Sequence, residues 1–350
     1  MVKHKSMPSE TDLNFIAKNN ILPLYGLKNS SIEQIKIKNT DKHRAVFKVS
    51  SQNKNYCLKK VYYSESDLLF VYSTMEWLFR NGIKLPRLLP SLNNNRYIKN
   101  NDFLFILTPW IEGDKCDFDN LQNIYSSSIT LATLHNAAKN FKPIEGSNIK
   151  EGYENLYISI STHFLKILQC YNSAIKRKDS FSKIFLDQFP LNFNLAKHSS
   201  YIASTINFDK LSKSLCHGDY VNKNILIINN EVWIIDFDNC CFKYSINDLC
   251  YFLRRLLRRN YTAWDFEVAK NCIEKYNSIR PINKDDAKYL LSYLSFPQKY
   301  WRLSKDYYNN VKKCNKDSFI DLLIKYTEMS QEHSFFISKL QNYLIKNFNI

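Results

Sequence analysis

The chain has 350 residues, 45% of them hydrophobic and 23% charged, which is typical of a globular protein and excludes a disordered one. Lys and Arg outnumber Asp and Glu by 49 to 33, so the net charge of +16 favours anionic partners, but no nucleic-acid motif accompanies it and we do not expect nucleic acid. Nine cysteines without a Cys-x-x-Cys pair, and no run of 18 apolar residues, argue against a disulfide framework, a zinc site and a membrane segment.

The first 109 residues predict a β-rich lobe. Runs of β-favouring residues separated by short polar turns indicate an antiparallel meander, which a helix follows. The expected elements, in chain order, are a helix over 9–20, strands over 32–38, 45–50 and 56–59, a helix that starts at Ser64 or Ser66 and stops at Gly82, and a hairpin over 96–99 and 103–107. Pro109 and Gly113 break the last strand, so we place the domain boundary at residue 109.

Residues 110–350 predict a mainly helical lobe. A helix from Asn120 carries a core-facing stripe of Leu and Ile, and two further helical stretches lie within 151–210. A later helix opens at Asp248. This stretch carries four arginines, Arg254, Arg255, Arg258 and Arg259. They form either a solvated face of the helix or a site for an anionic partner.

A β-hairpin interrupts this helical lobe. Two apolar runs, over 225–228 and 232–235, flank an Asn-Asn turn, and Asn tolerates the left-handed conformations of tight turns. Asp219 and Asn224 precede the hairpin and Asp236 leaves it, so hard oxygen donors gather at one end of the hairpin. Such donors suit Mg²⁺, and their order matches the template for phosphoryl transfer.

The same stretch carries a family resemblance. His217-Gly218-Asp219, with Asn224 five positions after the Asp, and the later Ile235-Asp236-Phe237-Asp238 resemble the aminoglycoside phosphotransferase and choline kinase branch of the kinase-like fold. The resemblance implies an α+β, bilobal protein-kinase-like fold, with a small antiparallel β-sheet lobe bearing one helix and a larger helical lobe carrying the catalytic hairpin. It also implies ATP or another NTP, Mg²⁺ and a small-molecule hydroxyl as the phosphate acceptor.

This resemblance assigns roles to the polar residues. Asp219 is implied as the base that accepts the proton of the attacking hydroxyl, and Asn224 and Asp236 as catalytic magnesium ligands. The residues expected in supporting positions are His217, Asp238 and Asp248. For Asp248 an N-cap of its own helix is an equal alternative.

A nucleotide-binding pair is expected in the N-terminal lobe. Lys59 ends the third strand, where the kinase pattern has a Lys that binds phosphates and pairs with a Glu on the next helix. Glu76 lies near the apolar face of that helix and is the expected partner, with Lys60 and Glu65 as the rival choices. The loop over 39–44 contains no glycine, which weakens the expected phosphate cradle.

Several phrases outside the hairpin resemble the CotS family of bacterial spore coat proteins. They are Tyr56–Lys60, Trp110–Gly113, Leu131–His135 and Phe296–Arg302 followed by Tyr307-Tyr308. Within them, His135 is more typical of a buried structural residue than of a catalyst. The resemblance implies a protein made in the cytoplasm of the mother cell and assembled with other proteins of the spore coat. The absence of an apolar leader at the start agrees with this.

Three functions follow from these patterns. An active small-molecule kinase predicts ATP affinity that depends on Mg²⁺, and we favour it because buried carboxylates without ligands cost stability. A catalytically retired kinase-like component of the coat would instead use its 23 Tyr, 23 Phe and nine Cys for packing and cross-linking. A nucleic-acid binder would rest on charge alone.

Overall fold

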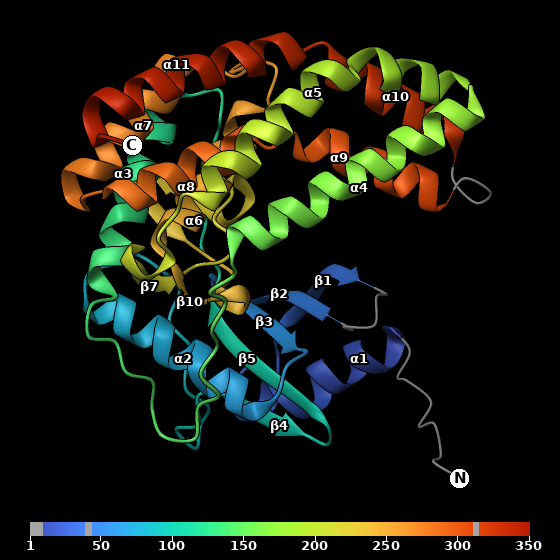
Figure 1. Ribbon diagram of the computed structural model, residues 1–350. Coiled ribbons are helices and arrows are strands. Elements are labelled where there is room, and N and C mark those ends of the chain that lie inside the picture. Colours follow the sequence, from blue (N-terminus) through green and yellow to red (C-terminus); the bar gives the residue numbers. More distant parts are fainter. Residues whose placement is uncertain (1–9, 39–43, 311–314) are drawn as a thin grey trace. The chain divides into compact units, whose positions relative to one another are not determined.

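The computed structural model describes residues 10–38, 44–310 and 315–350 of the chain (Figure 1). These residues divide into two compact units. Unit 1 joins the residues up to Asp114 to two later segments, Asn140–Lys150 and Leu226–Asp238, and unit 2 holds Lys115–Lys139, Glu151–Ile225 and Asn239–Ile350. The sequence predicts one boundary at residue 109, whereas unit 1 here also recruits the hairpin.

Unit 1 is built around an antiparallel sheet with the strand order β1-β2-β3-β5-β4. Its elements are α1 (Glu10–Ile16), a π-helical turn (Ala17–Ile21), a 3-10 turn (Leu22–Tyr25), β1 (Ser31–Lys38), β2 (Arg44–Ser51), β3 (Lys54–Val61), α2 (Glu65–Arg80), β4 (Ile98–Asn100) and β5 (Phe103–Pro109). The predicted meander and the predicted second hairpin are both present. Ser64 caps α2, as one of the two predicted choices, by accepting from the Asp67 N–H at 3.2 Å.

One face of this sheet forms the core of unit 1. Ala45, Phe47 and Val49 alternate along β2 and are fully buried, as the two-residue period of a strand requires. The apolar side of the N-terminal helical segment, including Leu13 and Ile21, packs in the same cluster. On β3, Lys59 follows the fully buried Leu58 and so lies on the opposite face of the sheet.

The predicted hairpin consists of β8 (Ile225–Ile228) and β9 (Glu231–Ile234). Asn229 and Asn230 turn between them with φ of 48° and 64°, so the predicted left-handed turn is confirmed. Together with β6 (Asp114–Lys115), the hairpin forms a sheet in the order β6-β8-β9.

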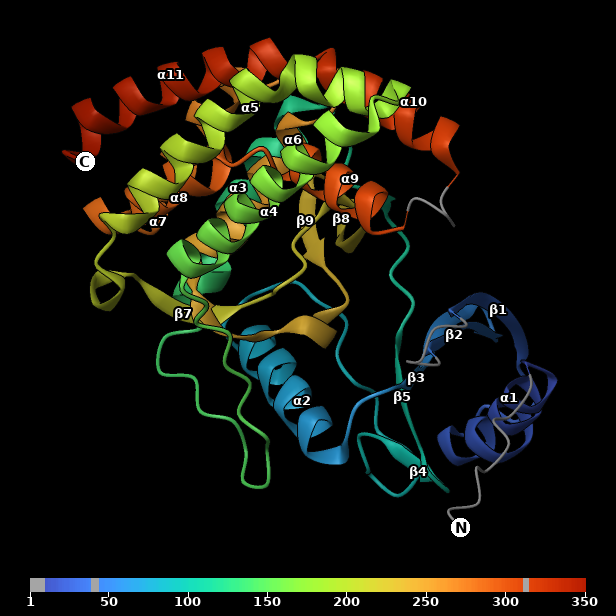
Figure 2. The ribbon, with the colours of Figure 1, turned by 45° about the vertical axis from the view of Figure 1, so that its right-hand side comes forward.

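Unit 2 is mainly helical. Its helices are α3 (Leu121–Ala137), α4 (Leu156–Arg177), α5 (Ser180–Ser204), α6 (Ser245–Leu257), α7 (Phe266–Ile279), α8 (Lys284–Ser295), α9 (Gln298–Asn309), α10 (Lys316–Thr327) and α11 (Ser330–Phe348), and β7 (Lys213–Cys216) pairs with β10 (Cys241–Tyr244). The long helices α4 and α5 lie side by side in both views (Figure 2). Within the described residues, no helix has both the length and the apolar character needed to span a membrane.

Aromatic side chains from the C-terminal part of the chain fasten α9 to α5. The rings of Phe181 and Tyr307 stack with centroids 3.9 Å apart, and those of Phe185 and Tyr300 with centroids 4.7 Å apart. Such offset pairs add to the burial of large apolar surfaces. Many of the tail's aromatic residues therefore have a structural role within unit 2.

Candidate functional site

The exit of the hairpin places two carboxylates against the predicted nucleotide lysine. Lys59 Nζ lies 2.8 Å from Oδ1 of Asp236 and 2.6 Å from Oδ1 of Asp238, all within unit 1. Asp236 has φ of 66°, a left-handed conformation that costs energy for a residue with a side chain and that clusters at functional sites. The hairpin thus holds Asp236 in one strained orientation facing Lys59.

The charge of Lys59 is stabilised by these carboxylates. Burial alone would lower the pKa of its ammonium, but the negative charges of Asp238 and then Asp236 outweigh burial and hold the pKa above its usual value. The ammonium therefore stays protonated in a site of low exposure. Such a fixed cation is suited to binding phosphate oxygens, while the paired carboxylates are suited to a metal ion.

The predicted pairing of Lys59 with Glu76 is wrong in this structure. Glu76 accepts from Arg87 Nη2 at 2.6 Å and from Arg80 Nε at 3.0 Å. The reason is that Arg80 lies one turn further along α2 and Arg87 follows after the helix ends, so two guanidinium groups satisfy the carboxylate. The rival Glu65 instead contacts Tyr97 and Lys99. The other rival, Lys60, lies over the Phe103 ring.

In unit 2, the loop after β7 orients the predicted base. Asn224 Nδ2 donates to Oδ2 and to the backbone oxygen of Asp219, both at 2.9 Å, and Lys223 Nζ lies 3.1 Å from the same carboxylate. The side-chain amide of Asn224 thereby donates both of its protons to Asp219. This leaves the Oδ1 atom of Asn224 as the atom that can bind a cation. His217 Nδ1 accepts from the Asp219 N–H at 3.2 Å and fixes the loop from within.

A buried carboxylate beneath this loop holds its backbone. Asp248 accepts from the His217 N–H at 2.7 Å and the Gly218 N–H at 3.2 Å. The expected hydrogen bonds from the loop to Asp248 are present, whereas the N-cap alternative is wrong, because Tyr244 occupies the cap and Asp248 lies in the first turn of α6. Gly218 has φ of 77°, and a Cβ there would overlap the Asn239 carbonyl oxygen.

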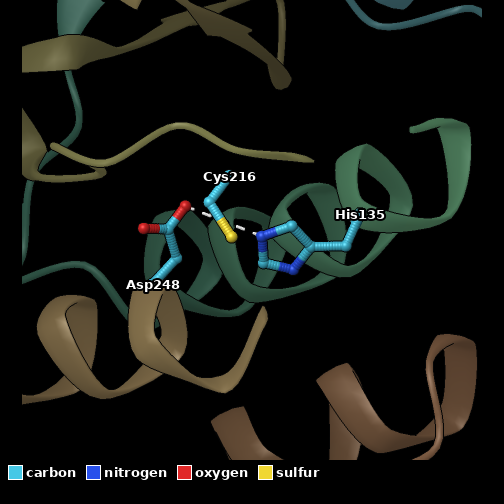
Figure 3. A group of neighbouring side chains, drawn as sticks. All are labelled: His135, Cys216 and Asp248. Atoms are coloured by element: carbon cyan, nitrogen blue, oxygen red, sulfur yellow. Dashed lines mark ion pairs between the residues drawn. The ribbon is translucent and has the colours of Figure 1, made fainter. Parts of the chain in front are cut away.

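His135 and Cys216 lie beside Asp248, and Figure 3 shows the three side chains pointing toward one another. The distance from His135 Nε2 to Asp248 Oδ2 is 3.6 Å, and His135 Nδ1 lies 2.7 Å from the Tyr276 hydroxyl. His135 is fully buried, so its predicted structural role is confirmed. A metal ion could span ligand atoms at this spacing, but the Asp248 oxygens already hold the catalytic loop.

The protonation of this buried group follows from its surroundings. Burial would raise the pKa of Asp248, but the neighbouring imidazole of His135, followed by His217 and its backbone N–H, outweighs burial and holds the pKa below its usual value. Burial lowers the pKa of His135 more than Asp248 raises it. Asp248 is therefore the ionised acceptor that two backbone N–H groups require.

Two residues that contact the predicted site residues, Tyr251 in unit 2 and Arg87 in unit 1, were not predicted from the sequence. Tyr251 lies on α6 one turn after Asp248, and its hydroxyl is 3.5 Å from Oδ1 of Asp219. Helical spacing from Asp248 was the signal that could have found it. Arg87 lies in the extended segment after α2 and carries no such signal. The glycine-free loop over 39–44 lies, apart from Arg44, outside the described residues.

The described geometry brings the site residues together in two sets. Lys59, Asp236 and Asp238 meet in unit 1, and a second set meets in unit 2, consisting of His217, Asp219, Asn224 and Asp248. Comparison with known proteins identifies the family: residues 30–340 match the one described as "Spore coat putative kinase YutH". The chain belongs to the YutH spore coat kinase family. This match does not name the CotS family, which several phrases of the sequence resemble, so that attribution stays a prediction.

Solved structures similar to this YutH family member confirm the fold class. An aminoglycoside phosphotransferase from Alicyclobacillus acidocaldarius is 20% identical, with a TM-score of 0.77 over 89% of this chain and 92% of that one. Amicoumacin kinase, in complex with AMP-PNP, Ca²⁺ and Ami, is 16% identical, with a TM-score of 0.61 over 93% and 94%. Spectinomycin phosphotransferase, in complex with ADP and spectinomycin, is 18% identical, with a TM-score of 0.61 over 95% and 99%. The aminoglycoside phosphotransferase and protein-kinase-like fold is thereby established.

Proposed function

We propose that this protein is an ATP- and Mg²⁺-dependent phosphotransferase that acts on a hydroxyl of a small molecule and works in the spore coat. One observation carries the proposal. Lys59 and Asp236, which are 177 residues apart and were assigned to phosphate and metal separately, are in direct contact at 2.8 Å. In a purely structural protein, the strained backbone of Asp236 would bring no gain in stability, because another residue at this position would cost less free energy. The CotS resemblance agrees with the coat setting.

The residues divide the chemistry as follows. Asp219 takes the proton of the acceptor hydroxyl, whose oxygen bonds to the terminal phosphorus of ATP as the bond to the bridging oxygen breaks and ADP leaves. Lys59 holds the phosphates. Asp248 keeps the Asp219 loop in place through the His217 and Gly218 N–H groups. Glu76 would join Lys59 only after release from Arg87.

The donor set fits magnesium. Asp236 offers a carboxylate and Asn224 an amide oxygen, the hard ligands that Mg²⁺ takes together with phosphate oxygens. When bound, the ion would neutralise charge that develops on the phosphates. Asp238 pairs with Lys59 and positions it. The nucleotides in the structures of amicoumacin kinase and spectinomycin phosphotransferase support the same assignment.

Calorimetric titration with ATP and Mg²⁺ tests this function. The wild-type chain is expected to bind ATP only with the metal, and Asp236→Ala to abolish binding. Asp219→Asn should retain ATP binding but lower turnover by about 10²–10⁴-fold, the usual contribution of a general base. Asp187→Ala, an exposed position on α5, is the matched control and should change neither property. Absence of any ATP affinity in the wild type contradicts the proposal.

The alternative is a catalytically retired kinase-like component of the spore coat. One observation favours it, because Glu76 is neutralised by Arg87 and Arg80 rather than by Lys59. Another disfavours it, because the described cysteines are buried, with Cys57 intermediate, and so poorly placed for cross-linking. Turnover separates the two functions, since a catalytically retired scaffold transfers no phosphate from ATP to an acceptor even where it binds ATP.

A further inference from the structure

Helix α6 carries a row of cations that begins beside the proposed base. Tyr251, Arg254, Arg255 and Arg258 recur at the spacing that places side chains on one face of a helix. Arg254 stacks on Tyr293 with its guanidinium carbon 3.8 Å from the ring centroid, and Arg255 lies 5.3 Å from that of Tyr251. Arg254 and Arg258 are only partly exposed, so this face is not fully solvated.

A second helix adds cations to this face. The pKa of Arg258 is lowered to about 10. The largest cause is burial, and the charges of Arg254 and Arg255 follow, with a contribution from Arg302 of α9. Burial, followed by Arg258 and Lys325, also lowers the pKa of Lys299 on α9. Like charges lower a pKa in this way only when they are close. Arg254, Arg255 and Arg258 share one face of α6 and its C-cap, and together with Lys299 of α9 they are called here the basic cluster.

The basic cluster lacks carboxylate partners. Among the residues that the structure describes, none of its four members is within ion-pair distance of an Asp or Glu. The neighbouring Arg259 differs, because it makes a two-pronged contact with Asp119 at 2.8 and 2.9 Å. Arg302 at the edge has Asp306 at 3.8 Å. Partly buried cations left close together are costly, and an oxyanion ligand would remove that cost.

The basic cluster is connected to the proposed base by one hydroxyl. Arg255 Nη2 donates to the Tyr251 hydroxyl at 3.0 Å, and this hydroxyl lies 3.5 Å from Oδ1 of Asp219. Along the α6 axis, Arg255 lies about 6 Å and Arg258 about 10 Å beyond Tyr251. All of these residues belong to unit 2, so one body contains both the base and the cations.

We infer that the phosphate acceptor is an alcohol that itself carries an oxyanion, a phosphate or carboxylate held by Arg255 and Arg258 while its hydroxyl faces Asp219. This inference rests on the proposed function, and it names the acceptor's charge. The axial distances suit an acceptor of sugar size, with the reacting hydroxyl at one end and the anion at the other. A cationic acceptor such as an amino alcohol is excluded from this site by repulsion.

Binding without nucleotide tests the inference on the full chain. We expect glucose 6-phosphate to bind at least about tenfold more tightly than glucose or glucosamine, the usual gain from hydrogen bonds to a charged group. Arg258→Gln should remove this preference, whereas Arg259→Gln, at the next position after the C-cap of α6 but paired with Asp119, should keep it. Equal affinity for the three sugars, or equal loss in both variants, overturns the inference.

A second comparison separates this inference from the proposed function. Lys59→Ala should lose ATP affinity and keep the affinity for glucose 6-phosphate, because Lys59 belongs to unit 1. If the wild type binds ATP but shows no preference for the anionic sugar, the inference fails and the function stands. If the anionic sugar binds and ATP does not, the kinase function fails, and with it the role of the basic cluster in holding an acceptor.

Discussion

At the scale of single residues, the loop that carries the proposed base Asp219 depends on a glycine, Gly218, for a steric reason. Gly218 adopts a left-handed φ of 77° and lies directly against the Asn239 backbone. A side chain would therefore meet both an unfavourable dihedral angle and an immovable carbonyl group. The N–H of this residue also donates to Asp248, so its position sets that of Asp219 next to it.

Gly218→Ala should lower the free energy of unfolding by about 3 kcal/mol or more, because the strained dihedral and the overlap add together. Gly82→Ala is the matched control: its φ is 85°, but no atom lies within 4 Å of the added Cβ. It should cost only about 1 kcal/mol, the dihedral penalty alone. Urea unfolding of both variants measures the difference, and equal losses would contradict the steric explanation.

At the scale of elements, local patterns were sufficient for the hairpin and insufficient for ion pairs. The strands β8 and β9 could be predicted from the Asn-Asn turn, because the φ angles of the turn residues and the two-residue period of a strand are local properties. The meander and α2 were predicted for the same reason. The partner of Glu76 was not, since Arg87 reaches it from outside the helix and no periodicity encodes that approach. For the arginines from Arg254 to Arg259, the helix period alone leaves a solvated face and an anion site open, because it does not encode the contacts with Tyr251 and Tyr293.

The hairpin turn supplies its own test. Asn230→Gly should maintain or slightly raise the thermal unfolding midpoint, because glycine adopts a φ of 64° without strain. Asn230→Val should lower the free energy of unfolding by about 1–2 kcal/mol, since a β-branched residue is disfavoured there. Thermal denaturation followed by circular dichroism measures both variants. A lower midpoint is expected for the valine variant but not for the glycine variant, and an equal decrease in both would argue against a left-handed turn.

At the scale of the whole molecule, buried histidines make the fold sensitive to acid. Burial lowers the pKa of His135, His163, His198 and His333, and that of His333 falls to about 4. His333 stacks on Trp264 with ring centroids 3.8 Å apart, and its Nε2 lies 2.8 Å from the Leu294 oxygen. The nearby charges of Arg258 and Arg254 oppose its protonation further.

Because the folded-state pKa of His333 lies below the unfolded value of 6.5, the unfolded chain takes up the proton first as the pH falls. His333 contributes on the order of 3 kcal/mol to the free energy of unfolding. This contribution is complete above pH 6.5 and is lost as the pH falls toward 4. His333→Gln keeps a donor for Leu294 but does not titrate. Urea unfolding from pH 7 to pH 4 should show a shallower decline for this variant, and parallel declines would refute the assignment.

The discontinuous make-up of unit 1 has a consequence for synthesis. Lys59 is made 177 residues before Asp236. At a translation rate of 5–20 residues per second, this is a delay of about 10–35 s. During that interval the growing chain contains the ammonium but neither of the carboxylates that neutralise it, so the N-terminal sheet leaves the ribosome without its final segment. The proposed nucleotide affinity can therefore arise only late in translation, and nascent chains released early are expected to be inactive and prone to degradation.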